Sequence, residues 1–184
     1  MKIALIGEAP NDTQAIKNLL IKRYASGKYE FVFLLQRING SNLDSQKTKR
    51  FLRVEFENQK PDLVIFIRDL DALLNDKSKL DERKFYFTEF NSVVDKKGFY
   101  LLNIFEIEAL ILADIDSFNV LYQTNIDTFL DVMLIQQPKE LLKNASKHYN
   151  ESHNGAIFEK LEFDKVMECK YFNDLIVELD KYLN

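Results

Sequence analysis

Apolar residues gather in four continuous runs along the first part of the chain, and segments with helical spacing separate these runs. The runs span residues 2–7, 31–35, 63–67 and 99–104. Uninterrupted apolar runs of this length are typical of strands that are buried on both faces of a parallel sheet. The alternation of such strands with helices predicts βαβ crossovers and an α/β fold, with a mainly parallel sheet of about four strands flanked by helices.

The segments between and after these runs show the three- and four-residue spacing of helices. Apolar residues recur at this spacing over residues 15–20, and Asn11 and Asp12 are the candidate N-caps of that helix. A second, charged helix is expected over residues 47–58. From Glu106 onward the spacing stays helical to the end of the chain, which predicts a helical C-terminal part.

The helical C-terminal part contains breaks but no domain linker. Pro138 and the polar stretch 147–155 interrupt the helical spacing, yet neither is long or rich in Gly and Ser. The sequence therefore predicts a single domain over residues 1–184. Within it we expect an α/β core over residues 1–114 and a helical extension over residues 115–184 that packs on this core.

Composition excludes several classes of protein. Hydrophobic residues make up 46% and charged residues 29% of the chain, with only 5 Gly and 3 Pro, which excludes disordered, collagen-like and low-complexity chains. The single cysteine, Cys169, excludes a disulfide scaffold and a Cys-rich zinc site and favours a cytoplasmic location. No apolar run approaches the roughly 20 residues that cross a bilayer, so no membrane association is expected.

Charge is distributed unevenly along the chain. The net charge of −4 argues against an indiscriminate polyanion binder. Residues 1–92 carry 16 Lys and Arg against 13 Asp and Glu, whereas residues 93–184 carry 9 against 16. We therefore expect any nucleic acid to bind the N-terminal half, through the basic residues Arg37, Lys47, Lys49, Arg50 and Arg53. The alternative for this segment is a solvated helix face.

Pairs of acidic residues directly follow three of the four predicted strands. The pairs are Glu8 with Asp12, Asp69 with Asp71, and Glu106 with Glu108. Because the carboxyl ends of parallel strands meet at one edge of a sheet, we expect the three pairs to converge there. Crowded carboxylates repel one another unless a cation lies between them, so the pattern indicates a site for Mg²⁺ or Mn²⁺.

Each acidic pair taken alone has a simpler interpretation. In an extended segment Asp69 and Asp71 point to the same side, as a metal site requires, but either could instead cap the following helix. Asp12 is a natural N-cap. If a helix begins at Glu106, then Glu106 and Glu108 do not share a face, and one of them only complements the helix dipole.

Three segments together carry a resemblance to a known family. They are the strand end GExxxD at residues 7–12, the strand end RDLDA at 68–72, and EIEALILAD at 106–114. Further along, the matching features are Pro138-Lys139, Lys147, Tyr149, Gly155 and the closing segment CKYFNDLIVEL. The chain resembles the Toprim-related proteins of domain-of-unknown-function family 4276, which are related to the overcoming-lysogenization-defect nucleases. One departure is Ala9-Pro10, where many relatives have glycine and then proline.

This resemblance implies a Toprim/Rossmann-like fold and magnesium-dependent phosphodiester chemistry on DNA or RNA, beside an ATPase partner in bacterial defence against phage. Toprim domains hold magnesium through a Glu after the first strand and an Asp-x-Asp after a later strand. The matching catalytic residues are Glu8, Asp69 and Asp71, with Lys147 as the cation that balances developing charge. The full set of candidate metal ligands is Glu8, Asp12, Asp69, Asp71, Glu106 and Glu108.

Two other functions remain open from the sequence. A non-catalytic adaptor would keep the Toprim scaffold and bind an ATPase partner through its acidic helical half. A transferase would use Asp69 and Asp71 to hold a metal and nucleotide-sugar complex, but this leaves Glu8 without a role. We therefore expect a metal-dependent nuclease first, an adaptor second and a transferase last.

Overall fold

A four-stranded sheet forms the centre of the protein, and all of its strands run parallel. The computed structural model describes residues 1–24, 27–38 and 40–183. In spatial order the strands are β2 (Glu30–Phe33), β1 (Lys2–Ile6), β3 (Leu63–Asp69) and β4 (Gly98–Asn103). Each strand begins and ends within two residues of its apolar run. The predicted α/β fold with a parallel sheet is confirmed.

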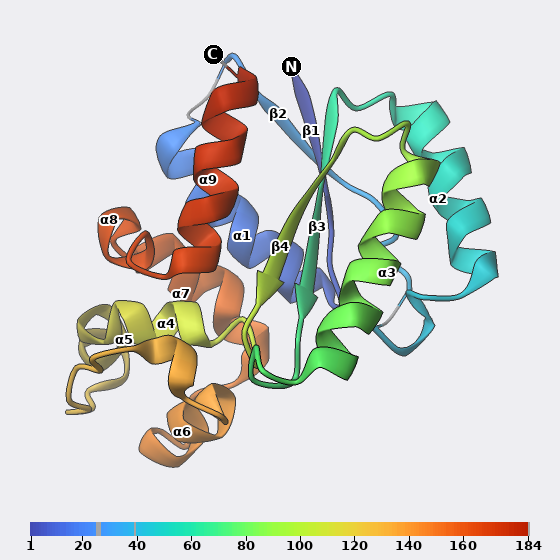
Figure 1. Cartoon of the computed structure of the whole chain (residues 1–184). Helices are drawn as coiled ribbons and strands as arrows, with labels where there is room; N and C mark the ends of the chain where they lie inside the picture. The colour runs from blue at the N-terminus through green and yellow to red at the C-terminus, as the bar shows by residue number, and fades with distance from the viewer. Residues whose placement is uncertain (25–26, 39, 184) are drawn as a thin grey trace.

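Helices cover both faces of this sheet (Figure 1). One face carries α1 (Pro10–Arg23) and α9 (Lys170–Leu183), and the other carries α2 (Gln46–Gln59) and α3 (Lys77–Val93). Side chains of β1 alternate between the two sides, because successive strand residues point in opposite directions. Ile3 and Leu5 join the core under α1, whereas Ala4 and Ile6 join the core under α2 and α3.

The helix starts follow local capping chemistry, with one difference from the sequence prediction. At α2 the Ser45 side chain accepts a hydrogen bond from the Thr48 N–H. The first helix begins earlier than expected, at Pro10, so the assignment of Asn11 or Asp12 as its N-cap is wrong. Proline is favoured at the first helical position because its fixed φ suits the helix and its missing N–H would have no partner there.

In Figure 1 the short helices of the C-terminal part lie to the left and lower left of the sheet, where α7 and α8 contact α1, and α9 then runs back along the sheet. These elements are α4 (Ala109–Ala113), α5 (Ile115–Tyr122), η2 (Val132–Leu134), α6 (Pro138–Ala145), η3 (Glu151–His153), α7 (Asn154–Lys160) and α8 (Phe163–Val166). Their apolar side chains belong to the same core cluster as β1 and α1. No helix in the described part of the chain is long and apolar enough to span a membrane.

The strand order creates a topological switch point at the carboxyl edge of the sheet, between β1 and β3. The chain leaves β1 toward β2 on one side and later returns to place β3 on the other side. The connections after β1 and β3 therefore diverge, and such a switch point is where open α/β sheets bind their ligands. Glu8 follows β1 and Asp69 ends β3, so both lie at this point.

Candidate functional site

Asp69 and Glu8 lie side by side at the switch point. The Oδ1 atom of Asp69 accepts a hydrogen bond from Asn103 Nδ2 at 2.9 Å. The backbone N–H of Asp69 donates to Glu8 Oε1 at 3.4 Å. The adjacent ends of β1, β3 and β4 therefore fix the positions of these two carboxyl groups.

Asp12 adds a third carboxyl group from the first turn of α1. Its Oδ2 accepts a hydrogen bond from the Ala9 N–H at 3.0 Å, which satisfies one free donor at the start of the helix. Burial raises the pKa of Asp12 to about 7, and the charges of Glu108 and Glu8 contribute to this rise. Asp12 is therefore both a helix-capping group and a member of a crowded acidic cluster.

Glu108 completes this acidic cluster, which consists of Glu8, Asp12, Asp69 and Glu108. The Glu108 side chain is buried and accepts hydrogen bonds from Asn154 Nδ2 at 3.0 Å and from the Tyr149 hydroxyl at 3.4 Å. Burial raises the pKa of Asp69 well above its usual range, and the charges of Asp12, Glu8 and Glu108 raise it further. Burial raises the pKa of Glu108 as well. The cluster therefore concentrates negative charge where little water can screen it.

Glu106 pairs with Lys139 beside the acidic cluster, and its charge acts on Glu108. Lys139 Nζ lies 3.1 Å from Glu106 Oε1, and the Lys139 N–H donates to Glu106 Oε2 at 3.2 Å. The helix after β4 begins only at Ala109, so both glutamates lie in the turn before it. The structure thus assigns different partners to Glu106 and Glu108, a choice that the sequence left open.

Asp71 does not share the orientation of Asp69, so the extended Asp-x-Asp arrangement that we expected is not present. Extended backbone ends at Asp69, and Asp71 has a left-handed φ of 55°. Asp71 Oδ2 lies 3.1 Å from Arg83 Nη2, and Arg83 Nε donates to the Asp69 carbonyl at 2.8 Å. Arg83 therefore holds Asp71 toward α3. Over the described residues, no three His, Cys, Asp or Glu side chains form a ready-made group for a metal ion.

Lys139, and not only the predicted Lys147, is a lysine to consider as the cation beside the acidic cluster. Lys147 is exposed in the turn between α6 and η3. The charge of Lys139 acts on the carboxyl groups of both Asp12 and Glu108. A sequence signal for Lys139 exists: it lies directly after Pro138 in the first turn of α6, where the helix dipole disfavours a cation.

Arg68 is a buried cation at the carboxyl edge of the sheet. The sequence alone did not show where its side chain points. Only 3% of its side chain is exposed. Its Nε lies 2.7 Å from Glu8 Oε1, and its Nη1 lies 2.6 Å from Asp44 Oδ1. The Tyr86 ring lies under the guanidinium, with its centroid 4.4 Å from Cζ. Arg68 therefore connects the acidic cluster to the segment just before α2.

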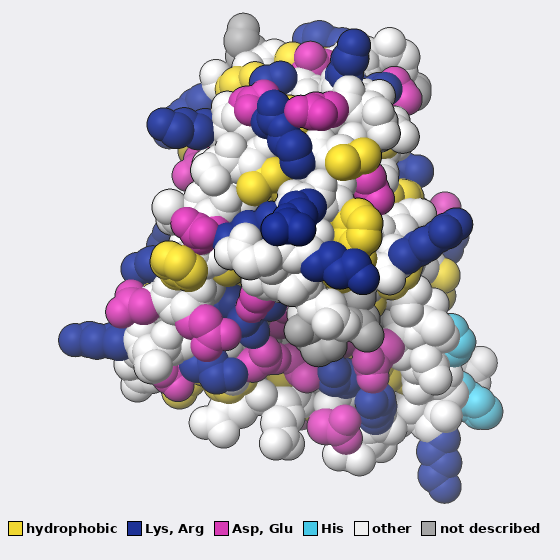
Figure 2. All heavy atoms as spheres, turned by 90° about the vertical axis from the view of Figure 1, so that its right-hand side faces the viewer, with side chains coloured by type: hydrophobic (Ala, Val, Ile, Leu, Met, Phe, Trp, Pro, Cys, Tyr) yellow, Lys and Arg dark blue, Asp and Glu magenta, His cyan; other side chains and the backbone are white. Residues whose placement is uncertain are grey.

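The basic segment lies on the outer surface of the face covered by α2 and α3 (Figure 2). In this view Lys and Arg side chains lie in the centre of the face among exposed apolar side chains, and Asp and Glu side chains lie both above and below them. Arg37, Lys47 and Arg50 are exposed. Lys49 instead pairs with Glu89 at 2.5 Å, and Arg53 pairs with Glu57 and Asp95. Two of the five predicted nucleic-acid-binding residues are thus held in ion pairs.

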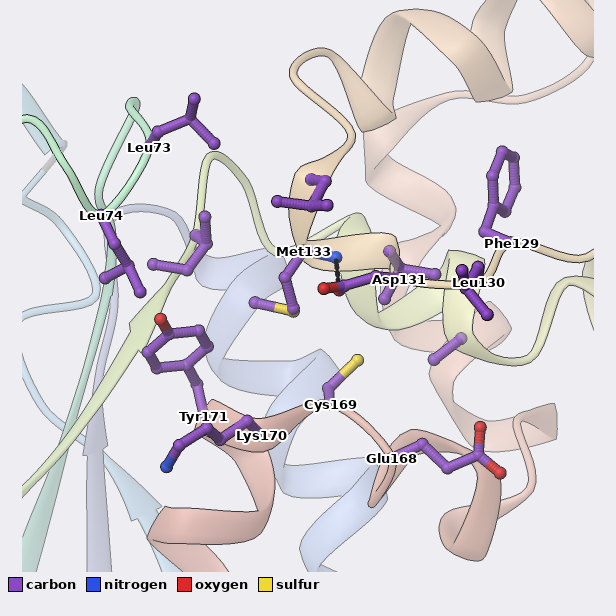
Figure 3. Close-up of a pocket in the computed structure, with 14 residues that line it drawn as sticks. Leu73, Leu74, Phe129, Leu130, Asp131, Met133, Glu168, Cys169, Lys170 and Tyr171 are labelled. Carbon is purple, nitrogen blue, oxygen red and sulfur yellow. Dashed lines mark hydrogen bonds between the residues drawn. The ribbon is translucent and has the colours of Figure 1, made fainter.

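A separate apolar groove of about 450 Å³ lies beside the loop after β3 (Figure 3). Leu73 and Leu74 form one wall, and Met133 and Cys169 lie opposite them. Asp131, which also lines the groove, accepts a hydrogen bond from the Met133 N–H and so stabilises the start of η2. Its lining combines apolar side chains with Asp131, Glu168, Lys170 and Tyr171, so it differs in character from the acidic cluster.

Comparisons of the chain with protein-family models, with curated proteins and with solved structures gave no match. The geometry and charge of the site therefore carry the functional argument. The main features for that argument are the acidic cluster, Arg68 and the basic face of α2.

Proposed function

We propose that the protein carries out Mg²⁺- or Mn²⁺-dependent phosphodiester chemistry, as a nuclease acting on DNA or RNA. The observation that carries this proposal is the acidic cluster at the switch point. Among the described residues, Asp12, Asp69 and Glu108 have no ion-pair partner, although all three are largely enclosed. Such an arrangement costs stability unless a cation binds, and a metal-dependent function explains why the fold tolerates it.

The donor chemistry of the cluster fits a hard divalent cation. Mg²⁺ prefers carboxylate oxygens and commonly binds only one or two of them directly. Asp12 and Asp69, with Glu8, are the residues that would hold the ion, and their side chains would have to move together to do so, because they do not form a ready-made group as they lie. When bound, Mg²⁺ supplies positive charge that polarises a phosphoryl oxygen.

Other residues of this edge have roles that follow from their positions. Lys139 is the cation that would balance developing charge, in place of Lys147. The exposed basic residues on α2 would bind the phosphate backbone, which gives affinity without reading sequence. Asn103 keeps the Asp69 carboxyl group in position through its hydrogen bond.

The alternative is a scaffold without catalytic activity that binds a partner protein such as an ATPase. The apolar groove beside β3 is the observation that favours it, since Leu130 and Leu134 on its rim are strongly exposed. A role in defence against phage would fit either function and rests on the family resemblance. A nucleotide-sugar transferase has less support, because Arg83 holds Asp71 apart from Asp69.

Asp69→Asn tests the metal site, with Asp71→Asn as the matched control. Asparagine keeps the shape of Asp69 and removes one charge from the cluster. We expect the metal-free Asp69→Asn protein to be at least as stable as wild type and to lose both magnesium-dependent stabilisation and any cleavage. Asp71→Asn removes the same charge outside the cluster and should keep the magnesium shift. Thermal melts with and without Mg²⁺, beside a nuclease assay, measure both effects.

At saturating metal, the expected stabilisation is large enough to measure. At a concentration one hundred times its dissociation constant, a ligand that binds only the native state stabilises it by about 2.7 kcal/mol. Equal magnesium shifts in wild type and Asp69→Asn would contradict the proposed site. Loss of the magnesium shift in Asp71→Asn alone would place the ion near Arg83 instead.

A further inference from the structure

Tyr86 buries a hydroxyl group beside Arg68 without giving it a partner. The residue is 4% exposed, and its hydroxyl has no hydrogen-bond partner among the described residues. Burial raises the pKa of Tyr86 to about 12, and the charges of Arg68, Asp44 and Glu8 also act on this group. The Arg68 guanidinium, which contacts both Asp44 and Glu8, lies over the Tyr86 ring with Cζ 4.4 Å from the ring centroid. An unsatisfied buried donor is costly, which suggests that something else accepts its hydrogen bond during function.

Asp44 is the more accessible of the two carboxylates on Arg68. Its side chain is 46% exposed, compared with 27% for Glu8 and 3% for Arg68. It lies in the segment that leads into α2, directly before the N-cap Ser45. Because nearly half of the Asp44 side chain is exposed, this carboxylate can turn into solvent and leave its place on Arg68 to another anion.

The start of α2 also favours an anion at this position. The first turn of this 14-residue helix contains no acidic residue, and Lys47 lies in it. The N-terminal end of a helix carries partial positive charge, which disfavours a lysine unless an anion is near. Asp44 is the carboxylate that lies next to this helix end and on Arg68.

We propose that Arg68, the Tyr86 hydroxyl and the start of α2 form a binding site for one phosphate group of a nucleic acid, a site that the Asp44 carboxylate occupies in the free protein. This inference rests on the proposed function and adds the substrate contact beside the metal site. A phosphodiester carries one negative charge, as Asp44 does, so the exchange leaves the net charge around Arg68 unchanged. The guanidinium suits both anions, because its parallel N–H groups match carboxylate and phosphate oxygens.

Glu8 links the proposed phosphate site to the acidic cluster. The same guanidinium that contacts Asp44 also contacts Glu8, a member of the acidic cluster. A phosphate on Arg68 would therefore lie next to the carboxyl groups that would hold the metal. Asp44 would act as a built-in competitor that keeps this position closed until substrate arrives.

The test uses a thymidine dinucleotide, which carries a single phosphodiester, titrated into the full chain and followed by NMR in the presence of EDTA. We expect Asp44→Asn to bind it about three- to tenfold more tightly than wild type, because the competing charge is gone. We expect Tyr86→Phe to bind it more weakly by a similar factor while melting at or above the wild-type temperature, since the hydroxyl has no partner to lose and its burial is costly. Asp174→Asn is the matched control, because Asp174 forms an exposed ion pair with Lys170 within α9.

Several outcomes would overturn the inference. Equal affinity of wild type and Asp44→Asn, or an equal gain in Asp174→Asn, would show that Asp44 does not compete for a phosphate. Wild-type affinity in Tyr86→Phe would remove the hydroxyl from the site. Absence of dinucleotide binding by every variant would reject the site as a whole. Because EDTA removes divalent ions, none of these outcomes depends on whether the acidic cluster binds metal.

Discussion

Asp12 links the acidic cluster to the stability of the fold. Burial and neighbouring charges raise the pKa of this carboxyl group from 3.8 to about 7 in the native protein. Between these two pH values the native chain therefore holds more protons than the unfolded chain. When the native state binds more protons, its free energy of unfolding falls as the pH rises. The metal-free protein should accordingly lose stability from about pH 4 to about pH 7, and the buried Asp69 should add to this loss.

Asp12→Asn should reverse much of this loss. Asparagine can still accept the hydrogen bond from the Ala9 N–H but brings no charge into the cluster. We expect the free energy of unfolding at pH 8 in EDTA to rise by roughly 1–2 kcal/mol, with a smaller pH dependence between pH 4 and 7. Urea denaturation at several pH values measures both. Asp76→Asn, at the exposed start of α3, is the control, and an equal gain there would argue against crowding as the cause.

Single residues also show how far the sequence could predict this site. The placement of Glu8 and Asp69 at one edge followed from their positions at the ends of apolar runs. The direction of Asp71 did not, because its left-handed backbone and its pairing with Arg83 depend on a helix that starts several residues later. Likewise, the choice between Lys139 and Lys147 required the packing of α6, which the spacing of residues does not determine.

On the helix α2, some basic side chains hold the helix against its neighbours, whereas others are exposed to solvent. Lys49 and Arg53 contribute to contacts with α3 and the turn after it, whereas Lys47 and Arg50 are exposed. Charge reversal at Lys49 or Arg53 would therefore disturb the packing of two helices as well as any nucleic-acid contact. The two exposed residues are the better probes of binding.

Lys47→Glu combined with Arg50→Glu should weaken nucleic-acid binding and flatten its salt dependence. Each phosphate contact contributes about 0.7 to 0.9 to the slope of log K against log salt, so losing both should reduce the slope by about 1.5. Fluorescence anisotropy with a labelled single strand at several salt concentrations measures the slope. Lys160→Glu combined with Lys181→Glu changes the net charge equally on α7 and α9. A similar fall in that control would assign the effect to net charge alone.

Elements differed in how well the sequence predicted them. The strands were predicted within two residues because each coincides with an apolar run; β1 and β3 are buried along nearly their whole length, and the edge strands β2 and β4 are partly buried. The C-terminal helices were predicted only as a helical region. Most are short, and their ends depend on distant partners, as when the Asp114 side chain accepts a hydrogen bond from the Glu162 N–H before α8.

In the molecule as a whole, the sheet and the C-terminal part share one apolar core. The side of the sheet under α1 is also covered by α9, whose Phe172, Leu175, Ile176 and Leu179 are buried. Burying four such side chains contributes about 6–12 kcal/mol, which is comparable to the whole stability of a typical domain. The boundary that we expected at residue 114 therefore marks a change in the sequence pattern. The apolar core continues across it.

A fragment of residues 1–114 should accordingly not fold alone. We expect poor dispersion of its amide signals in an NMR spectrum and no cooperative thermal transition. Adding residues 115–184 as a separate chain should restore both if the two parts recognise each other. A cooperatively folded fragment would show instead that α9 is dispensable for the α/β core.

Cys169 makes the docking of α9 measurable in the unmodified protein. It is the only cysteine of the chain, it is 1% exposed just before α9, and burial raises the pKa of its thiol to about 12. Since the thiolate is the reactive form, alkylation at neutral pH must wait for a local opening of this region. The alkylation rate of the wild-type chain therefore reports how often α9 detaches, and whether bound magnesium or nucleotide slows that motion.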